Sequence, residues 1–153
     1  MSEQDRAQVV VVMSAGMRAH TAHVLGRGMW QATMRAIKDN PQLGARLLTG
    51  MEQQEAVDEL MSWSFSEQQD VLAAMAEPTA ARLLAALPAE LRQKLLSGLP
   101  PHVAANIVSA MQPPPAAASL DALELQRAIA ILMAMDPAAA AALLQELGAG
   151  KAA

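Results

Sequence analysis

A repeat of twelve residues runs without gaps from Ala45 to Ala152 and limits what this chain can fold into. In each of the nine successive blocks, the fourth and seventh positions are apolar. The fourth position holds Leu48, Leu60, Leu72, Leu84, Leu96, Val108, Leu120, Leu132 and Leu144, and the seventh holds Met51, Trp63, Met75, Leu87, Leu99, Met111, Leu123, Met135 and Leu147. A fixed period of this kind indicates a stack of similar structural units.

The apolar positions of each block fit one side of a helix. The last residue of one block and the third, fourth and seventh of the next are spaced i, i+3, i+4 and i+7, an arc of about 100°. Turn residues often follow at the eighth or ninth position: Ser64, Pro88, Pro100, Pro101, Pro113, Asp136, Pro137 and Gly148. Helices this short are stable only when their apolar sides pack on neighbours. The sequence therefore predicts an all-α fold, a solenoid or superhelix of short helices.

The repeat also predicts which side chains form the core. We assign to the structural core Leu48, Leu60, Trp63, Leu72, Leu84, Leu87, Leu96, Leu99, Val108, Leu132 and Leu144. The rest of the composition agrees with helices, since the chain has one Phe, two Trp and no Tyr. Strands usually draw on aromatic and β-branched residues.

Composition also excludes several kinds of site. The chain has no Cys, hence no disulfide and no thiolate ligand, which suits a reducing compartment such as the cytoplasm or an organelle interior. No apolar run approaches the roughly 18–20 residues of a membrane span, so we expect a soluble chain. No dense basic stripe is present, and a nucleic-acid partner is not expected.

The register weakens before Ala45, where Arg27 and Asp39 occupy the apolar seventh position. We predict a longer first helix over residues 5–25 that ends at Gly26–Gly28, and a second helix before Asn40. A strand is the alternative for Val9–Val12.

Three further features blur the C-terminal half. The missing turn residue at 124–125 predicts one longer helix from Ser119 to Met135. The three consecutive prolines at 113–115 predict a stiff hinge over 112–118, and residues 149–153 are predicted to be a frayed tail. The predicted organisation is an irregular N-terminal segment over 1–44 and a repeat domain over 45–148.

The clearest repeats read PTAARLLAALP over Pro78–Pro88, LLSGLP over Leu95–Pro100 and AANIV over Ala104–Val108. This pattern resembles the cytoplasmic N-terminal domain of MgtE-type magnesium transporters and the related helical repeats of the flagellar motor switch protein FliG. The resemblance is close over residues 69–112 and looser over 45–148. It rests on packing and turn residues, and so is more specific for a fold than for a function.

The resemblance implies a superhelix of short helices that binds or senses something. In the transporters this domain acts with a second cytoplasmic domain and a membrane channel. Neither is in this sequence, so transport is not expected. A flagellar switch subunit would also carry a charged torque-generating helix, which this sequence lacks.

Seven acidic residues between positions 52 and 77 are not interrupted by Lys or Arg. Among them, Glu52, Glu55 and Glu59 share one helix face. Magnesium takes oxygen ligands, often one or two carboxylates completed by waters, so these three are candidate ligands of a weak Mg²⁺ site. The alternatives are a solvated acidic face and a docking surface for a basic partner.

No catalytic constellation emerges, and the chain is not expected to be an enzyme. His20 and His23 share a helix face, but zinc sites need three or four protein ligands, which favours surface or packing roles. Gly26–Gly28 lacks the Lys and Ser or Thr of a phosphate-binding loop. His102 follows two prolines and is expected to be exposed.

The first fifty residues hold six Arg or Lys against three acids and are rich in Met. Exposed Met and aromatic side chains are good interface anchors, and Met17, Met29, Trp30, Met34 and Phe65 are the candidate partner-binding residues. Core packing is the alternative for each. We therefore expect a non-catalytic protein–protein interaction module, a scaffold or accessory subunit of a larger complex. The alternative function is a Mg²⁺-responsive regulatory domain.

Overall fold

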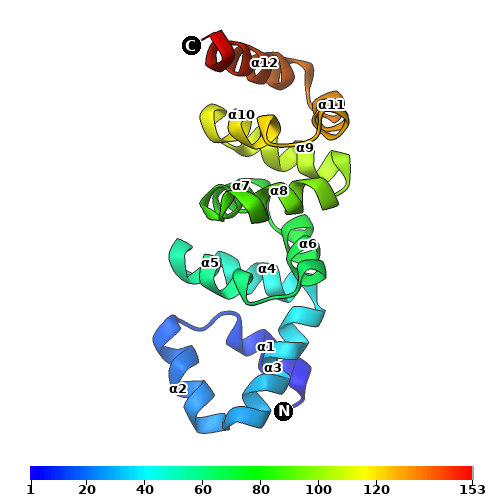
Figure 1. The fold of residues 1–153 in the computed structure, drawn as a ribbon. Helices are drawn as coiled ribbons and strands as arrows, with labels where there is room; N and C mark the ends of the chain where they lie inside the picture. Colours follow the sequence, from blue (N-terminus) through cyan, green and yellow to red (C-terminus); the bar gives the residue numbers. More distant parts are fainter. Residues whose placement is uncertain (153) are drawn as a thin grey trace. The chain divides into compact units, whose positions relative to one another are not determined.

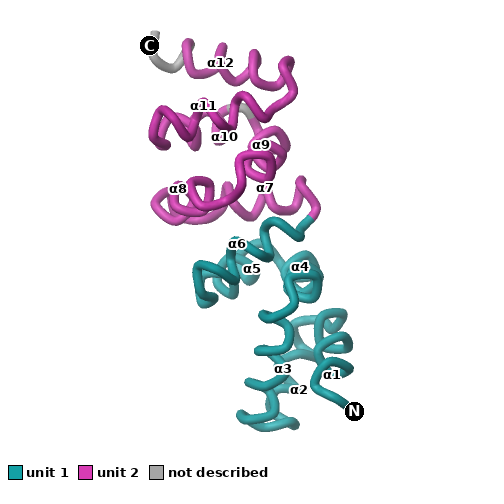
Figure 2. The backbone as a smooth tube through the Cα atoms, turned by 90° about the vertical axis from the view of Figure 1, so that its right-hand side faces the viewer, with its two compact units in different colours: residues 1–75 teal, residues 76–153 magenta. Residues whose placement is uncertain are grey.

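The computed structural model describes residues 1–152, apart from the side chains of 113 and 149–152. Over this part of the chain there are twelve α-helices and no strand, so the fold is all-α as predicted (Figure 1). The helices fall into two compact units, residues 1–75 and 76–153 (Figure 2). The repeat pattern changes at residue 44, whereas the boundary between the two compact units lies after Met75.

The first unit is a bundle of helices built around α3 and α4. Its elements are α1 (Glu3–Val10), α2 (Ala15–Leu25), α3 (Arg27–Asp39), α4 (Pro41–Thr49), α5 (Gln53–Met61) and α6 (Phe65–Ala74). Helices α1, α2 and α4 all pack against α3, and α4 also packs against α5 and α6. Ile37, Leu47 and Leu60 are fully buried in this unit and supply its core.

The second unit consists of two columns of alternate helices. Its elements are α7 (Glu77–Ala86), α8 (Ala89–Gly98), α9 (Pro101–Ala110), α10 (Pro113–Asp121), α11 (Leu125–Ala134) and α12 (Pro137–Ala152). Helices α7, α9 and α11 pack in one series, and α8, α10 and α12 in the other. Residues in equivalent positions of one column are therefore two repeats apart, as Leu84 and Val108 are, and both of these are buried.

Some of the helices begin at a residue whose side chain caps the backbone. The Asn40 side chain accepts hydrogen bonds from the backbone N–H groups of Gln42 and Leu43, at 3.1 and 3.4 Å, at the start of α4. Asp136 accepts one from the Ala138 N–H at 3.2 Å at the start of α12. Such caps satisfy backbone donors that have no partner within the helix.

The predicted long helix over residues 5–25 is wrong, because the chain turns between Val10 and Ala15. The Ser14 hydroxyl accepts a hydrogen bond from the Met17 N–H at 3.3 Å and caps α2. The β-branched side chains just before it favour helix weakly. No strand forms over the described residues, so the strand alternative is wrong as well.

The glycines at 26 and 28 have different roles. Gly26 has φ of +83° and ends α2, a conformation that favours glycine over residues with a side chain. Helix α3 begins immediately at Arg27, so Gly28 lies inside a helix and does not belong to the turn.

The single helix predicted from Ser119 to Met135 is also wrong, since α10 ends at Asp121 and α11 begins at Leu125. Glu124 adopts an extended conformation there, although its side chain makes no cap hydrogen bond. The turn follows the twelve-residue period, and Leu123 in the seventh position is buried. Tertiary packing of that side chain replaces the missing turn residue.

Two other C-terminal predictions need correction. Residues 113–118 are the first part of α10 and form no hinge, because proline is well tolerated in the first turn of a helix. The backbone of α12 is helical to Ala152, so the predicted frayed tail is wrong up to that residue. Residue 153 lies outside the described part of the chain.

The predicted core residues are buried in nine of eleven cases. The nine are Leu48, Leu60, Trp63, Leu72, Leu84, Leu87, Leu96, Leu99 and Val108. Leu132 is only half-buried and Leu144 is 55 % exposed, so their assignment to the core is wrong. Both lie in the last helix of their column, where no further described helix covers the fourth position of the repeat.

Candidate partner-binding cavity

The first unit contains a cavity of about 460 Å³, partly open to solvent, between α2, α3, α4 and α5. We call it the α2–α5 cavity. It is lined by Ala15, Arg18, Ala19, Ala22, Trp30, Gln31, Met34, Lys38, Leu47, Met51, Glu55 and Glu59. Apolar side chains thus share the walls with two basic and two acidic residues.

The space exists because, apart from Arg18, α2 offers only small side chains to it. Ala15, Ala19 and Ala22 are spaced i, i+4 and i+7, and so form one face of the helix. Larger apolar residues at these positions would pack into the cavity and fill it. Trp30 and Met34, one helical turn apart on α3, also line the cavity and are half-buried.

An arginine holds α2 to the rest of the unit. Arg18 is 7 % exposed and is the buried residue of α2. One terminal nitrogen donates a hydrogen bond to the Met13 carbonyl at 2.6 Å, and the other forms an ion pair with the Glu55 carboxylate of α5. A partly buried ion pair of this kind fixes position more than it adds stability.

Beside the cavity, Trp63 organises the charged residues of α3 and α5. Its indole N–H donates to the Glu59 carboxylate at 3.1 Å. The Lys38 ammonium lies 5.9 Å from the ring centroid, within the range of a cation–π contact. Glu59 and Lys38, which both line the cavity, are therefore positioned through the same buried aromatic ring.

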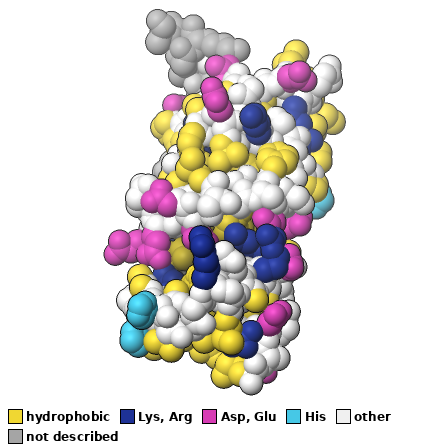
Figure 3. Space-filling model, turned by 60° about the horizontal axis from the view of Figure 1, so that its bottom comes forward, with side chains coloured by type: hydrophobic (Ala, Val, Ile, Leu, Met, Phe, Trp, Pro, Cys, Tyr) yellow, Lys and Arg dark blue, Asp and Glu magenta, His cyan; other side chains and the backbone are white. Residues whose placement is uncertain are grey.

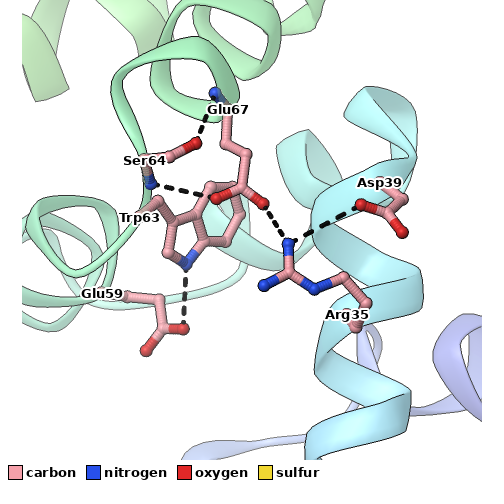
Figure 4. Close-up of polar contacts among 6 residues, drawn as sticks. All are labelled: Arg35, Asp39, Glu59, Trp63, Ser64 and Glu67. Atoms are coloured by element: carbon pink, nitrogen blue, oxygen red, sulfur yellow. Dashed lines mark hydrogen bonds and ion pairs between the residues drawn. The ribbon is translucent and has the colours of Figure 1, made fainter.

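Figure 4 shows a second group of polar contacts next to that ring. Ser64 and Glu67 form a capping box at the start of α6, in which each backbone N–H donates to the other side chain, at 3.0 and 3.2 Å. Arg35 of α3 donates to Glu67 at 2.9 Å and also pairs with Asp39 at 3.8 Å. These contacts connect α3 to the start of α6.

The Glu67 carboxyl is more acidic than an ordinary glutamate. Partial burial acts to raise its pKa, but the hydrogen bonds from Ser64 and the charges of Arg35 and Lys38 outweigh this effect and lower it. The pKa of Asp5 is lowered too, first by the Ser2 side chain and then by the Ser2 backbone N–H. Both carboxylates are structural caps and lie outside the cavity lining.

The predicted partner-binding residues are not all brought together. Trp30 and Met34 line the α2–α5 cavity, whereas Met17, Met29 and Phe65 do not. Those three are 57, 46 and 44 % exposed respectively. On the visible face of the chain in Figure 3, basic and acidic side chains lie among hydrophobic ones.

The three predicted magnesium ligands are not gathered into one cluster. No group of three or more His, Cys, Asp or Glu side chains that could hold a metal ion is found over the described residues. Glu55 pairs with Arg18, Glu59 accepts from Trp63, and Glu52 is the exposed N-cap residue of α5. His20, His23 and His102 are exposed.

Several cavity residues were not predicted from the sequence. A sequence signal for Arg18 does exist, because it is a single arginine on a helix face that otherwise carries alanines. Lys38, Leu47 and Met51 carry no such pattern, because they meet the cavity through contacts between α3, α4 and α5.

In this geometry the α2–α5 cavity offers hydrophobic contact and charges of both signs.

The described part of the chain contains no helix with both the length and the apolar character needed to cross a membrane. Residues 77–153 match the family model described as the MgtE intracellular N domain. The chain belongs to this family.

The MgtE intracellular N domain match coincides with the second compact unit, from α7 to α12. The resemblance to the MgtE N-terminal domain predicted from the sequence is therefore confirmed over residues 77–153. The first unit, with the α2–α5 cavity, lies outside the residues that the MgtE intracellular N domain covers. No significant match was found among curated proteins or among solved structures.

Proposed function

We propose that this chain is a non-catalytic interaction module that binds a partner protein through the α2–α5 cavity. The single observation that carries the proposal is the cavity lining, in which Trp30 and Met34 of α3 lie together with an alanine face of α2. An apolar side chain of the partner fits between these walls, with Arg18 and Glu55 at its side. Binding pockets typically combine apolar and aromatic walls with a few polar groups, and Trp and Arg are enriched among the residues that carry most of the energy of a protein interface.

The family match supports a role in regulation or interaction. The MgtE intracellular N domain is, by its name, an intracellular domain of a larger protein, and we expect this chain also to act inside the cell and together with other polypeptides. The α2–α5 cavity lies in the unit that precedes the matched residues. We propose that this unit gives the chain its partner specificity.

The test is to block the cavity without disturbing the core. Ala19 lines the cavity yet is exposed, so Ala19→Trp should cover the opening and leave the fold intact. Ala73→Trp, at an exposed site of α6 outside the lining, is the matched control. Each tagged variant would be captured from its own cells and the bound chains quantified by mass spectrometry.

We expect one protein recovered stoichiometrically with the wild type and with Ala73→Trp, and reduced about tenfold or more with Ala19→Trp. Circular dichroism melts should show that both variants are folded. Equal recovery with both variants would exclude the cavity as the binding site, and no specific protein with the wild type would exclude the proposed function.

The second candidate function is a Mg²⁺-responsive regulatory domain, and the family match is what favours it. Magnesium can bind through one or two carboxylates with waters, so a site need not contain a cluster of ligands. A ligand that binds only the folded state raises its stability by mass action, about 2.7 kcal/mol at one hundred times Kd. A Mg²⁺ titration of the melting temperature, with Ca²⁺ and a matched increase of NaCl as controls, tests this candidate; an unchanged melting temperature removes it.

A further inference from the structure

Helix α2 contributes no apolar side chain to the core of the first unit. Of its eleven residues only Arg18 is buried. Each of the other five helices of the unit buries at least two apolar side chains, as α1 does with Ala7 and Val10. Segments with few buried apolar contacts open locally at a much smaller free-energy cost than global unfolding. Helix α2 is therefore the element of this unit that separates most easily from the rest.

A single polar contact joins α2 to another helix. It is the ion pair between Arg18 and Glu55 of α5. The Thr21 hydroxyl and the other terminal nitrogen of Arg18 reach only Met13, in the turn that precedes α2. Over the residues that the structure describes, no further side-chain hydrogen bond or ion pair extends from α2 to a different helix. We call the Arg18–Glu55 pair the latch.

Both connections of α2 are non-helical, which leaves the helix free to swing. Residues 11–14 form a turn before it, and Gly26 joins it to α3 with φ of +83°. A Cβ atom on Gly26 would have no other atom within 4 Å, so the backbone has room to rotate there. Hinges are a few residues at the ends of elements that absorb a change in φ and ψ. Rotation at these two connections would move α2 while α1 and α3 stay packed against each other.

Helix α2 also forms one wall of the α2–α5 cavity. It supplies the face made of Ala15, Ala19 and Ala22 together with Arg18. Moving this wall away separates mainly methyl groups from the rest of the lining, and the cost of exposing apolar surface grows with its area. Leu47 lines the same cavity yet is 0 % exposed, so solvent reaches it only when a wall moves.

We propose that α2 is a lid over the α2–α5 cavity, hinged at Gly26 and held closed by the latch. The lid opens and closes in the free chain. The further step, that opening admits the partner, rests on the proposed function. The strength of the latch then controls the open fraction of the chain, and the apparent affinity for the partner falls in proportion to that fraction.

Thiol labelling of the chain alone measures the opening, since the chain has no cysteine of its own. Leu47→Cys places a thiol in the cavity lining. Leu60→Cys is the matched control, because Leu60 is a leucine of the same unit that is also 0 % exposed but lies outside the lining. With an aromatic disulfide reagent in native buffer, we expect Leu47→Cys to react about tenfold faster or more, since it needs only the lid to open. Circular dichroism melts check that both variants are folded.

The latch is tested by adding Arg18→Met to each cysteine variant. Labelling of Leu47→Cys should then accelerate about fivefold, as expected for loss of a partly exposed ion pair, while labelling of Leu60→Cys should not change. A general loss of stability would accelerate both thiols alike. Met34→Cys, a milder substitution in the same lining, repeats the test if Leu47→Cys does not fold.

Equal labelling rates of the two thiols, or equal acceleration of both by Arg18→Met, would overturn the lid. That result leaves the cavity itself as a binding site, which the capture experiment with Ala19→Trp decides separately. Conversely, a lid that opens in a chain that captures no partner would contradict the proposed function alone.

Discussion

The edge of the Trp63 indole lies against Gly44, so closely that a Cβ atom on Gly44 would stand 3.1 Å from Cη2 of the ring and 3.2 Å from Cζ3. The same Cβ would also lie 3.2 Å from Cγ2 of Val71, a buried side chain of α6. Helices α4 and α6 can pack this closely only because residue 44 has no side chain. Trp63 in turn positions Lys38 and Glu59 beside the α2–α5 cavity.

Gly44→Ala should therefore destabilise the first unit by about 1–3 kcal/mol, the usual result of adding a methyl group to a packed core. Gly16→Ala is the control, since nothing lies within 4 Å of a Cβ atom there. That substitution should stabilise the chain slightly, because alanine favours helix. Thermal melts followed by tryptophan fluorescence measure both changes, and equal stabilities would contradict the packing argument.

Arg18→Met should loosen α2 while leaving the second unit unchanged. The substitution keeps an unbranched, apolar side chain but removes the guanidinium and its ion pair with Glu55, whose side chain is 39 % exposed. Because of that exposure, we expect a loss of only about 1 kcal/mol. Amide hydrogen exchange in α2 should accelerate several-fold, whereas exchange in α7–α12 should not change.

The comparison with Glu55→Gln sharpens this prediction. If the ion pair is the cause, each single substitution and the double substitution should give similar exchange rates in α2, since the second removes nothing further. Additive effects would mean that Arg18 acts through its hydrogen bond to the Met13 carbonyl instead.

Glu67 should make the stability of the first unit depend on pH. Its pKa in the folded chain is below the unfolded value of 4.5. Such a carboxyl contributes stability that is fully present above the unfolded pKa and is lost as the pH falls through the folded pKa. Denaturant melts between pH 7 and pH 3 should show a smaller acid-induced loss in Glu67→Gln than in the wild type.

The matched control is Glu52→Gln, at an exposed N-cap position without a side-chain cap hydrogen bond. Its stability should follow the wild-type pH dependence. Part of the acid-induced loss should remain in Glu67→Gln, because the pKa of Asp5 is lowered in the same direction. An unchanged acid-induced loss in Glu67→Gln would show that the capping box does not depend on this charge.

Arg127→Met should destabilise the second unit by about 1.5–3 kcal/mol, because the Leu96 carbonyl would lose two charge-assisted hydrogen bonds. Arg127→Lys should recover only part of the loss, since lysine lacks the second donor of the guanidinium fork. Urea titrations measure all three proteins. Equal stability of the lysine variant and the wild type would show that a single donor is sufficient.

The repeat made most of this fold predictable, because apolar residues such as Leu84 and Leu96 recur every twelve residues. Each marks the buried side of one short helix that packs on its neighbours. Predictions from local signals were less reliable. The prolines at 113–115 suggested a hinge, and the lack of a turn residue near Glu124 suggested a long helix, yet packing determined both boundaries.

The α2–α5 cavity was only partly predictable, for a similar reason. Trp30 and Met34 attract attention as large apolar residues in an irregular segment. Their relation to Arg18, Glu55 and Glu59 depends on how two other helices, α2 and α5, pack against α3 and α4, and no sequence spacing encodes that. The acidic residues were predicted to act together, but each has a different structural partner.

The two columns of the second unit also restrict how such a chain can change in length during evolution. Loss or duplication of a single repeat would shift every later helix into the opposite column, so that residues selected to face one neighbour would meet another. Loss or duplication of two repeats together returns each helix to its own column, as the equivalence of Leu84 and Val108 illustrates. Relatives of this domain should therefore differ in size by pairs of helices.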